Sequence, residues 1–116
     1  LVVRGGMPAH KLRRVLDAMH AGLADTFDLS RLAARADLSA FHFSRVFKQA
    51  TGMSPSRYFM RLRMDEARRL LSDTAMSVLD IGLAVGYASP SHFAQVFRES
   101  TGVSPSAWRG ARQARS

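Results

Sequence analysis

An internal repeat with a period of 50 residues constrains this chain more than any other feature of its sequence. Residues 42–56 and 92–106 are identical at nine of fifteen positions, in the order His, Phe, Val, Phe, Thr, Gly, Ser, Pro and Ser. Upstream of these stretches the offset is 49, so the second copy contains one added residue, near Ala88. Such a repeat indicates one supersecondary unit built twice, and the chain must therefore bury two similar cores.

Each copy predicts a helix that buries one face. Side chains suited to burial recur at i, i+3, i+4 and i+7, which is the spacing of one helix face. The expected inward residues are Phe43, Val46, Phe47 and Ala50 in the first copy and Phe93, Val96, Phe97 and Ser100 in the second. Ser39 and Ser89 suit the N-caps, and Gly52 and Gly102 suit the C-terminal stops. The helices are expected at about 39–51 and 89–101.

A shorter helix precedes each of these two. Aliphatic residues at helical spacing predict it over about 29–36 in the first copy and 78–85 in the second. The turns that follow are tight, and Gly86 suits a left-handed backbone position. A short helix, a tight turn and a second helix make a helix-turn-helix, so the chain is expected to contain two of them.

Further helices complete an all-α prediction of about seven helices. An opening helix covers about 8–22, a long helix covers about 55–72, and the pair Ser104-Pro105 begins a last helix. The expected organisation is an extension or linker at 1–7, a first helix-turn-helix subdomain at 8–53, a bridging helix at 54–73, and a second subdomain with the C-terminal tail at 74–116. The bridge is about 27 Å long, which is close to the roughly 34 Å between two helices that read one face of B-DNA.

The net charge of +8 is concentrated in two places. Residues 38–64 contain five basic residues and no acidic residue, and residues 86–116 carry a net +3. Together these blocks account for the whole net charge, and each overlaps one copy of the repeat. Phosphate binding needs cations without competing carboxylates, so the pattern favours a polyanionic partner, nucleic acid first.

The outward faces of the two longer helices differ between the copies, whereas the inward faces match. The expected base-reading residues are Ala40, Phe41, Ser44 and Arg45 in the first copy and Ser91, Ala94 and Gln95 in the second. Arginine can pair bidentately with guanine and glutamine with adenine, while alanine or phenylalanine can touch the thymine methyl group. The residues better placed to bind phosphate are Lys48, Arg57, Arg61, Arg98 and Arg109.

Structural roles compete with these functional ones. Phe41 could instead cover the turn as a partly buried aromatic side chain, and Arg45 could form a surface ion pair. His42 and His92 occupy matching positions in the two copies, and packing or capping is the favoured role for both.

The sequence contains no motif for catalysis, a metal or a cofactor. It has no nucleophile elbow, phosphate loop or dinucleotide glycine motif, and the absence of cysteine excludes thiol chemistry and Cys-ligated metals. Asp65 and Glu66 lie among arginines, where local ion pairs are the simple interpretation. We predict no enzyme, no catalytic residue, no metal and no cofactor, and the short apolar runs predict no membrane partner.

From about Pro8 to Arg112 the sequence resembles the DNA-binding domain of the arabinose-regulator (AraC/XylS-type) transcription factors. The residues that carry the resemblance are Ile81-Gly82-Leu83-Ala84-Val85-Gly86-Tyr87, Ser91-His92-Phe93, Val96-Phe97-Arg98, Thr101-Gly102-Val103-Ser104-Pro105 and Trp108-Arg109. The resemblance implies a bacterial transcription regulator, cytoplasmic and nucleoid-associated, whose two recognition helices enter successive major grooves of double-stranded DNA.

By position, the resemblance also implies base contacts from Phe41, Ser44, Arg45, Ser91, Ala94 and Gln95. Two departures stand out, because the family often has alanine where Gly82 lies and many members carry arginine where Gln95 lies. Family members often join this domain to an effector-binding or dimerisation domain. The chain does not begin with Met, so we expect a fragment of a longer regulator, with an effector ligand bound only through a domain absent here and RNA polymerase as a further candidate partner.

A protein-interaction module that docks an acidic partner is the competing function. An exposed Phe41 and the arginine-bearing faces could equally meet an acidic protein. Binding to single strands or RNA is less favoured, because the aromatic residues fall mainly on core faces and form no stacking platform.

Overall fold

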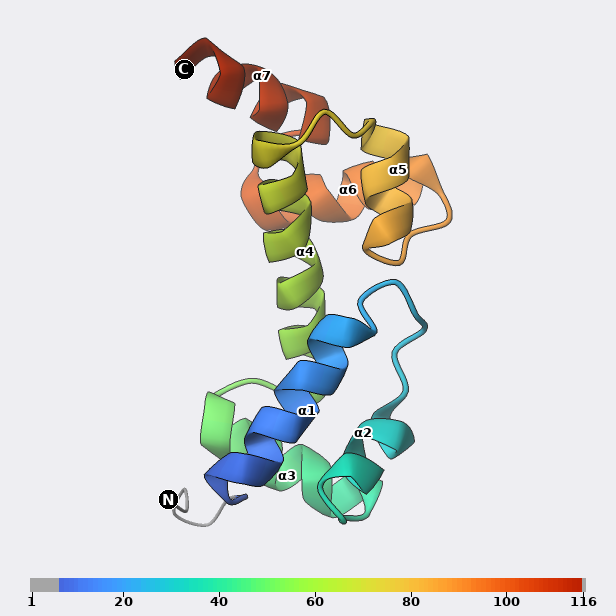
Figure 1. Ribbon diagram of the computed structural model, residues 1–116, viewed down its shortest axis with the longest axis vertical. Helices are drawn as coiled ribbons and strands as arrows, with labels where there is room; N and C mark the ends of the chain where they lie inside the picture. The colour runs from blue at the N-terminus through green and yellow to red at the C-terminus, as the bar shows by residue number, and fades with distance from the viewer. Residues whose placement is uncertain (1–6, 116) are drawn as a thin grey trace. The chain divides into compact units, whose positions relative to one another are not determined.

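The computed structural model describes residues 7–115, with side chains as far as residue 112, and this part of the chain forms helices and no β-strand (Figure 1). The helices are α1 (Ala9–Ala21), α2 (Leu29–Arg35), α3 (Ala40–Thr51), α4 (Pro55–Asp73), α5 (Val78–Ala84), α6 (Pro90–Thr101) and α7 (Pro105–Arg115). The all-α prediction with two helix-turn-helix units is confirmed. Where both ends of a helix were predicted, each lies within one residue of the observed end.

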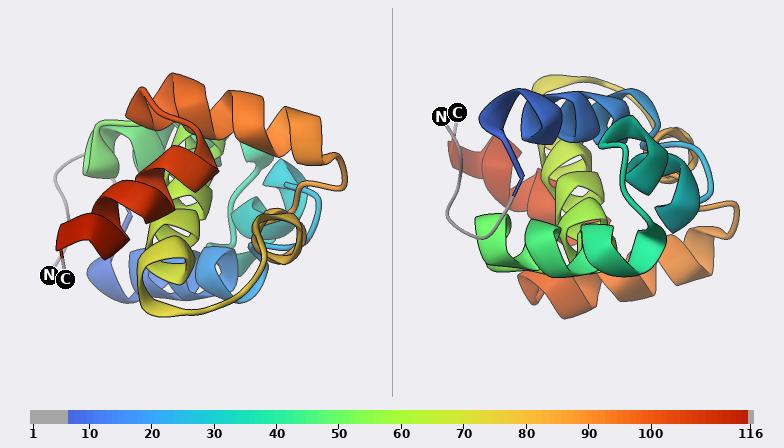
Figure 2. Two further views of the ribbon diagram at one scale, coloured as in Figure 1. Left: turned by 90° about the horizontal axis from the view of Figure 1, so that it is seen from above. Right: turned by 90° about the horizontal axis from the view of Figure 1, so that it is seen from below.

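The chain divides into two compact units, and the division falls inside α4, between Arg61 and Leu62. Unit 1 contains α1, α2, α3 and the start of α4, and unit 2 contains the rest of α4 with α5, α6 and α7 (Figure 2). The predicted bridging helix therefore supplies buried side chains to both units. Phe59 belongs to the core of unit 1, whereas Met64 and Leu71 belong to the core of unit 2.

The longer helix of each helix-turn-helix unit, α3 or α6, is anchored by two phenylalanines, as the repeat predicts. Phe43 and Phe47 in α3 and Phe93 and Phe97 in α6 are all fully buried. Their ring centroids lie 5.5 Å apart in α3 and 5.9 Å apart in α6. Each buried ring contributes about 1.5–3 kcal/mol, so these four side chains fix which face of each helix points inward.

The inward stripe of α6 is shorter than predicted. Ser100 was expected on the buried face, but it is exposed, whereas its counterpart Ala50 is half-buried. Both residues lie in the last turn of their helices, where the stripe runs out of the core, and a hydroxyl gains nothing by leaving water there. The prediction of an inward Ser100 was wrong.

The turn of each helix-turn-helix unit uses the same backbone geometry. The N–H group of Leu38 donates to the carbonyl of Ala33 at 3.0 Å, and the N–H group of Tyr87 donates to the carbonyl of Gly82 at 2.8 Å. This Schellman arrangement places one residue in the left-handed region. That residue is Asp37 in unit 1 (φ 59°) and Gly86 in unit 2 (φ 93°).

The two turns differ in length by one residue. Four residues, 36–39, join α2 to α3, and five, 85–89, join α5 to α6. The insertion predicted near Ala88 is therefore confirmed, and it lies after the Schellman turn.

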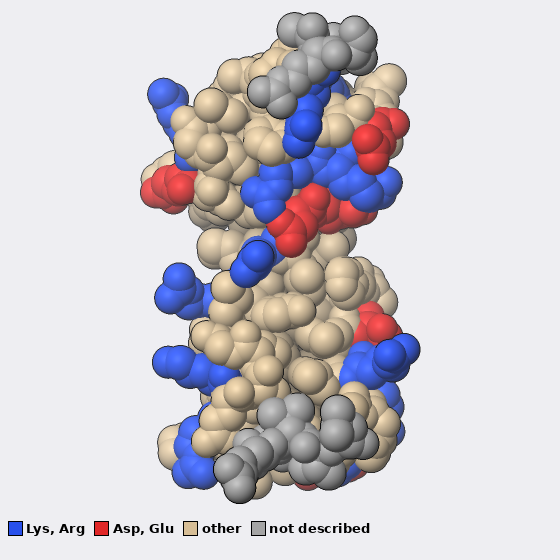
Figure 3. All heavy atoms as spheres, turned by 90° about the vertical axis from the view of Figure 1, so that its left-hand side faces the viewer, with Lys and Arg blue, Asp and Glu red and all other residues tan. Residues whose placement is uncertain are grey.

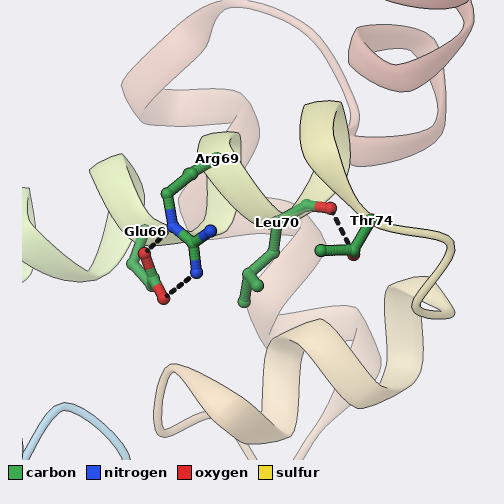
Figure 4. A network of polar contacts seen from close by, with 4 residues as sticks. All are labelled: Glu66, Arg69, Leu70 and Thr74. Carbon is green, nitrogen blue, oxygen red and sulfur yellow. Dashed lines mark hydrogen bonds and ion pairs between the residues drawn. The ribbon is translucent and has the colours of Figure 1, made fainter.

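A threonine ends three of the helices. The hydroxyl Oγ1 atoms of Thr51, Thr74 and Thr101 lie 2.9, 2.6 and 2.8 Å from the carbonyl oxygen four residues earlier (Figure 4 shows Thr74 with Leu70). Each also accepts a hydrogen bond from the backbone N–H two residues later. The hydroxyl thus satisfies groups that a helix end leaves without partners.

We predict opposite effects for two glycine substitutions in unit 2. Gly86→Ala should lower the free energy of unfolding by about 1–2 kcal/mol, because an L side chain is strained at positive φ. Gly110→Ala should raise it by up to about 1 kcal/mol, because Gly110 is helical and a Cβ atom there meets nothing within 4 Å. Urea unfolding of both variants checks this. Equal stability of the two variants would contradict the assigned backbone roles.

Candidate nucleic-acid interface

The predicted reading residues of α3 lie on its outward face. Phe41 is 76% exposed and Arg45 is exposed, while Ala40 and Ser44 are half-buried. The alternative that Phe41 covers the turn as a partly buried side chain is therefore wrong. Arg45 has no ion pair with any residue that the structure describes, so its guanidinium is available to a partner.

The predicted reading residues of α6 have smaller side chains. Ser91 and Gln95 are exposed, and Ala94 is half-buried. The helix begins with Ser89, whose hydroxyl accepts the N–H of His92 at 3.2 Å, just as Ser39 accepts the N–H of His42 at 3.2 Å in α3.

The two matched histidines have partly different roles. The ring of His92 packs edge-on against Tyr87, with centroids 5.3 Å apart, which confirms a packing role for that side chain. The residues His42 and His92 are both exposed, so the ring contact with Tyr87 is what distinguishes His92.

Four of the five predicted phosphate-binding residues are exposed cations. Lys48 in α3, Arg57 and Arg61 in α4 and Arg98 in α6 are all exposed, and none forms an ion pair within the described part of the chain. Arg57 and Arg61 are four residues apart, so they share one face of α4. That helix begins directly after α3, which places both cations in the same unit as the reading face of α3.

Arg109 is held by the fold itself. Its Nε donates to the carbonyl of Leu71 at 3.1 Å, and its Nη2 donates to the carbonyl of Thr74 at 3.3 Å. These carbonyls lie at the C-terminal end of α4, where a helix leaves acceptors unsatisfied and favours positive charge. The neighbouring Trp108 donates from Nε1 to the Ser72 hydroxyl at 3.4 Å. Sequence reasoning missed this role, because the contacts span 35 residues or more.

Local ion pairs occupy the arginines that follow Asp65 and Glu66. Arg68 pairs with Asp65, and Arg69 donates from Nε and Nη2 to the two oxygens of Glu66 at 2.7 and 2.9 Å (Figure 4). The hydrogen bond and the charge of Glu66 raise the pKa of Arg69. The local pairing predicted from the sequence is confirmed, and these two cations are partly neutralised within unit 2.

Unit 1 has a second charged region that the sequence did not reveal. Lys11 and Arg14 in α1 lie 3.4 and 3.7 Å from the carboxylate of Asp37, and Lys11 also donates to the carbonyl of Ala36 at 3.3 Å. An open pocket of about 460 Å³ lies beside it, between α1, the loop after α1, and α2. The described residues contain no group of acidic and histidine side chains that could hold a metal ion.

Comparison with known proteins identifies the family. A family model described as "Helix-turn-helix domain" matches residues 32–111, more than half of the chain. The crystal structure of an AraC-type transcriptional regulator from Chromobacterium violaceum superposes with a TM-score of 0.81 at 33% identity, covering 89% of this chain and 92% of that one. The chain belongs to the AraC-type helix-turn-helix family.

Other members of the AraC-type family show how this domain is used. The DNA-binding domain of AdpA, solved in complex with a target DNA, superposes with a TM-score of 0.83 at 35% identity, covering 90% of this chain and 95% of that one. The transcriptional regulator GbdR of Pseudomonas aeruginosa is 36% identical over 79 residues, which is 68% of this chain and 22% of GbdR. The chain thus spans about a quarter of the length of the curated relatives that it matches. Within residues 7–115, no helix is both long and apolar enough to cross a membrane.

We predict that Arg109 stabilises the AraC-type domain. Arg109→Ala should lower the free energy of unfolding by about 1–3 kcal/mol, because it removes charged hydrogen bonds to the end of α4. Urea unfolding measures the change. Arg61→Ala is the matched control, and it should change stability by less than about 0.5 kcal/mol, since Arg61 is exposed. If both variants unfold at the same urea concentration, the capping role is contradicted.

Proposed function

We propose that this AraC-type domain binds double-stranded DNA in a sequence-specific manner and regulates transcription. The observation that carries the proposal is the pair of reading helices, whose buried faces match while their outward faces differ. A constant inner face preserves the fold, and a variable outer face is what two different half-sites require. The exposed cations around these faces supply the attraction to phosphate.

Base recognition is assigned to the outward residues of α3 and α6. Arg45 suits a bidentate pair with guanine, and Gln95 suits a bidentate pair with adenine. The exposed ring of Phe41 suits an apolar contact with a thymine methyl group. Ala40, Ser44, Ser91 and Ala94 line the same faces and let the helices approach the base edges closely.

Phosphate binding is assigned to Lys48, Arg57, Arg61 and Arg98. Such contacts fix the position of the protein on the duplex without reading sequence. Arg109 stays a predicted phosphate contact, although its Nε and Nη2 atoms already donate to carbonyl groups at the end of α4. We also propose that α3 and α6 enter successive major grooves, about 34 Å apart.

Contact with RNA polymerase, the response to an effector ligand, and a nucleoid location in the cytoplasm are further parts of this proposal. They rest on the family alone.

The competing function is a module that docks an acidic protein, and the exposure of Phe41 favours it. Selection from a pool of random duplexes separates the two. An enriched motif supports DNA recognition, and the absence of any enriched motif at low salt supports the docking module.

Two substitutions should separate base reading from phosphate binding. Arg45→Ala should weaken binding to the selected duplex by about 1–3 kcal/mol and relax the preference at one base pair. Arg98→Ala should weaken binding to all duplexes about equally and lower the salt dependence by about one charge. Fluorescence anisotropy titrations at several salt concentrations measure both effects. The assignment of faces is contradicted if both variants bind the selected duplex as tightly as the parent does.

A further inference from the structure

We propose that the two reading helices contribute unequally: α3 supplies most of the affinity and base selectivity, and α6 is a weak reader whose Glu99 opposes the DNA. This inference rests on the proposed function and assigns a division of labour to its two units. Because of the internal repeat, every outward position of α6 has a counterpart in α3, 50 residues earlier.

The outward positions of α6 are weaker than those of α3 in nearly every pair. The pairs are Phe41 and Ser91, Ser44 and Ala94, Arg45 and Gln95, Lys48 and Arg98, and Gln49 and Glu99. Only the pair of Lys48 and Arg98 conserves its chemistry, because both side chains are positively charged. In the others α6 loses an exposed aromatic ring, a hydroxyl group or a positive charge, or gains a negative one. Charged bidentate hydrogen bonds are about twice as strong as neutral ones, so replacing arginine by glutamine lowers the energy that a correct base can provide.

Glu99 lies at the edge of the reading face of α6, in the last turn of that helix. It follows Gln95 by four residues, so the two side chains occupy the same side of the helix. The side chains of Glu99 and Arg98 are both exposed. A carboxylate at this position repels the phosphates of a duplex that Gln95 reads, and its charge opposes the attraction that Arg98 provides. The counterpart of Glu99 in α3 is the neutral Gln49.

The charge of the two units shows the same inequality. Residues 1–61 contain ten basic and four acidic residues, a net +6, whereas residues 62–116 contain seven and five, a net +2. In unit 2, most of the described arginines are also engaged within the fold. Arg68 and Arg69 form ion pairs, Arg109 caps α4, and Arg63 and Arg112 lie over the rings of Tyr87 and Trp108.

The surface of each unit agrees with this division. In unit 2, the upper half of Figure 3, basic and acidic side chains lie next to one another. In unit 1, the lower half, basic side chains line the left edge of the view without acidic neighbours, whereas acidic and basic side chains lie together at its right edge. Cations without neighbouring carboxylates release more counterions when they bind phosphate, so unit 1 should provide most of the salt-dependent affinity.

A gain-of-function substitution tests the role of Glu99. Glu99→Gln gives α6 the residue that α3 carries, and it should tighten binding to every duplex by about two- to fivefold at physiological salt. Anisotropy titrations of the full chain measure the change. Asp73→Asn is the matched control, because it removes one negative charge from unit 2 at the end of α4, outside the reading helix, and it should leave affinity unchanged within error. Equal effects of the two substitutions, or no effect of Glu99→Gln, would overturn the proposal.

Selection from random duplexes tests the unequal reading. The parent should enrich a site with one strongly specified half and one weakly specified half. Arg45→Gln should weaken binding to that site by about tenfold or more, and Gln95→Ala by no more than about fivefold, the low end for a bidentate pair. Two equally specified halves, or equal losses from both substitutions, would refute the inference while leaving the proposed function intact. A parent that enriches no site would instead refute the proposed function, and the inference would fail with it.

Discussion

Burial of two phenylalanines on the inner face of each reading helix is the interaction on which the structure depends. Phe43 and Phe47 in α3, and Phe93 and Phe97 in α6, are fully removed from solvent. Because they fix the rotation of each helix about its axis, they also decide which residues point outward. The outward residues are then free to change without cost to the core, which lets one fold present two different surfaces.

Much of the fold is predictable from the sequence, because its helices begin and end on local signals. Serine caps and glycine stops lie within one turn of the residues that they serve, and the repeat supplies each signal twice. The left-handed Asp37 is not predictable in this way, since aspartate carries no strong signal for positive φ, whereas its counterpart Gly86 does. The role of Arg109 is also hidden, because its acceptors are carbonyls more than thirty residues away. Gly82 lies where a Cβ atom would come within 3.1 Å of the Phe93 ring, a contact that only the folded chain reveals.

The candidate site is predictable to the extent that exposure follows from helical periodicity. Phe41, Arg45, Ser91 and Gln95 are exposed where the spacing places them. What periodicity does not reveal is which cations are free to act. Arg109 looks like the other arginines in the sequence, yet its guanidinium already caps the end of α4, whereas the ion pairs of Arg68 and Arg69 follow from their spacing to Asp65 and Glu66. The inequality of the two units follows from those contacts together with the position of Glu99.

Exchanging the outward faces of α3 and α6 shows whether these faces read DNA. A variant in which Phe41, Ser44 and Arg45 trade places with Ser91, Ala94 and Gln95 keeps every buried residue of both reading helices. We expect this variant to unfold at nearly the same urea concentration as the parent and to select a DNA site with the two half-sites exchanged in order. A variant that folds normally but selects the parent site, or no site, would contradict the claim that these faces read DNA.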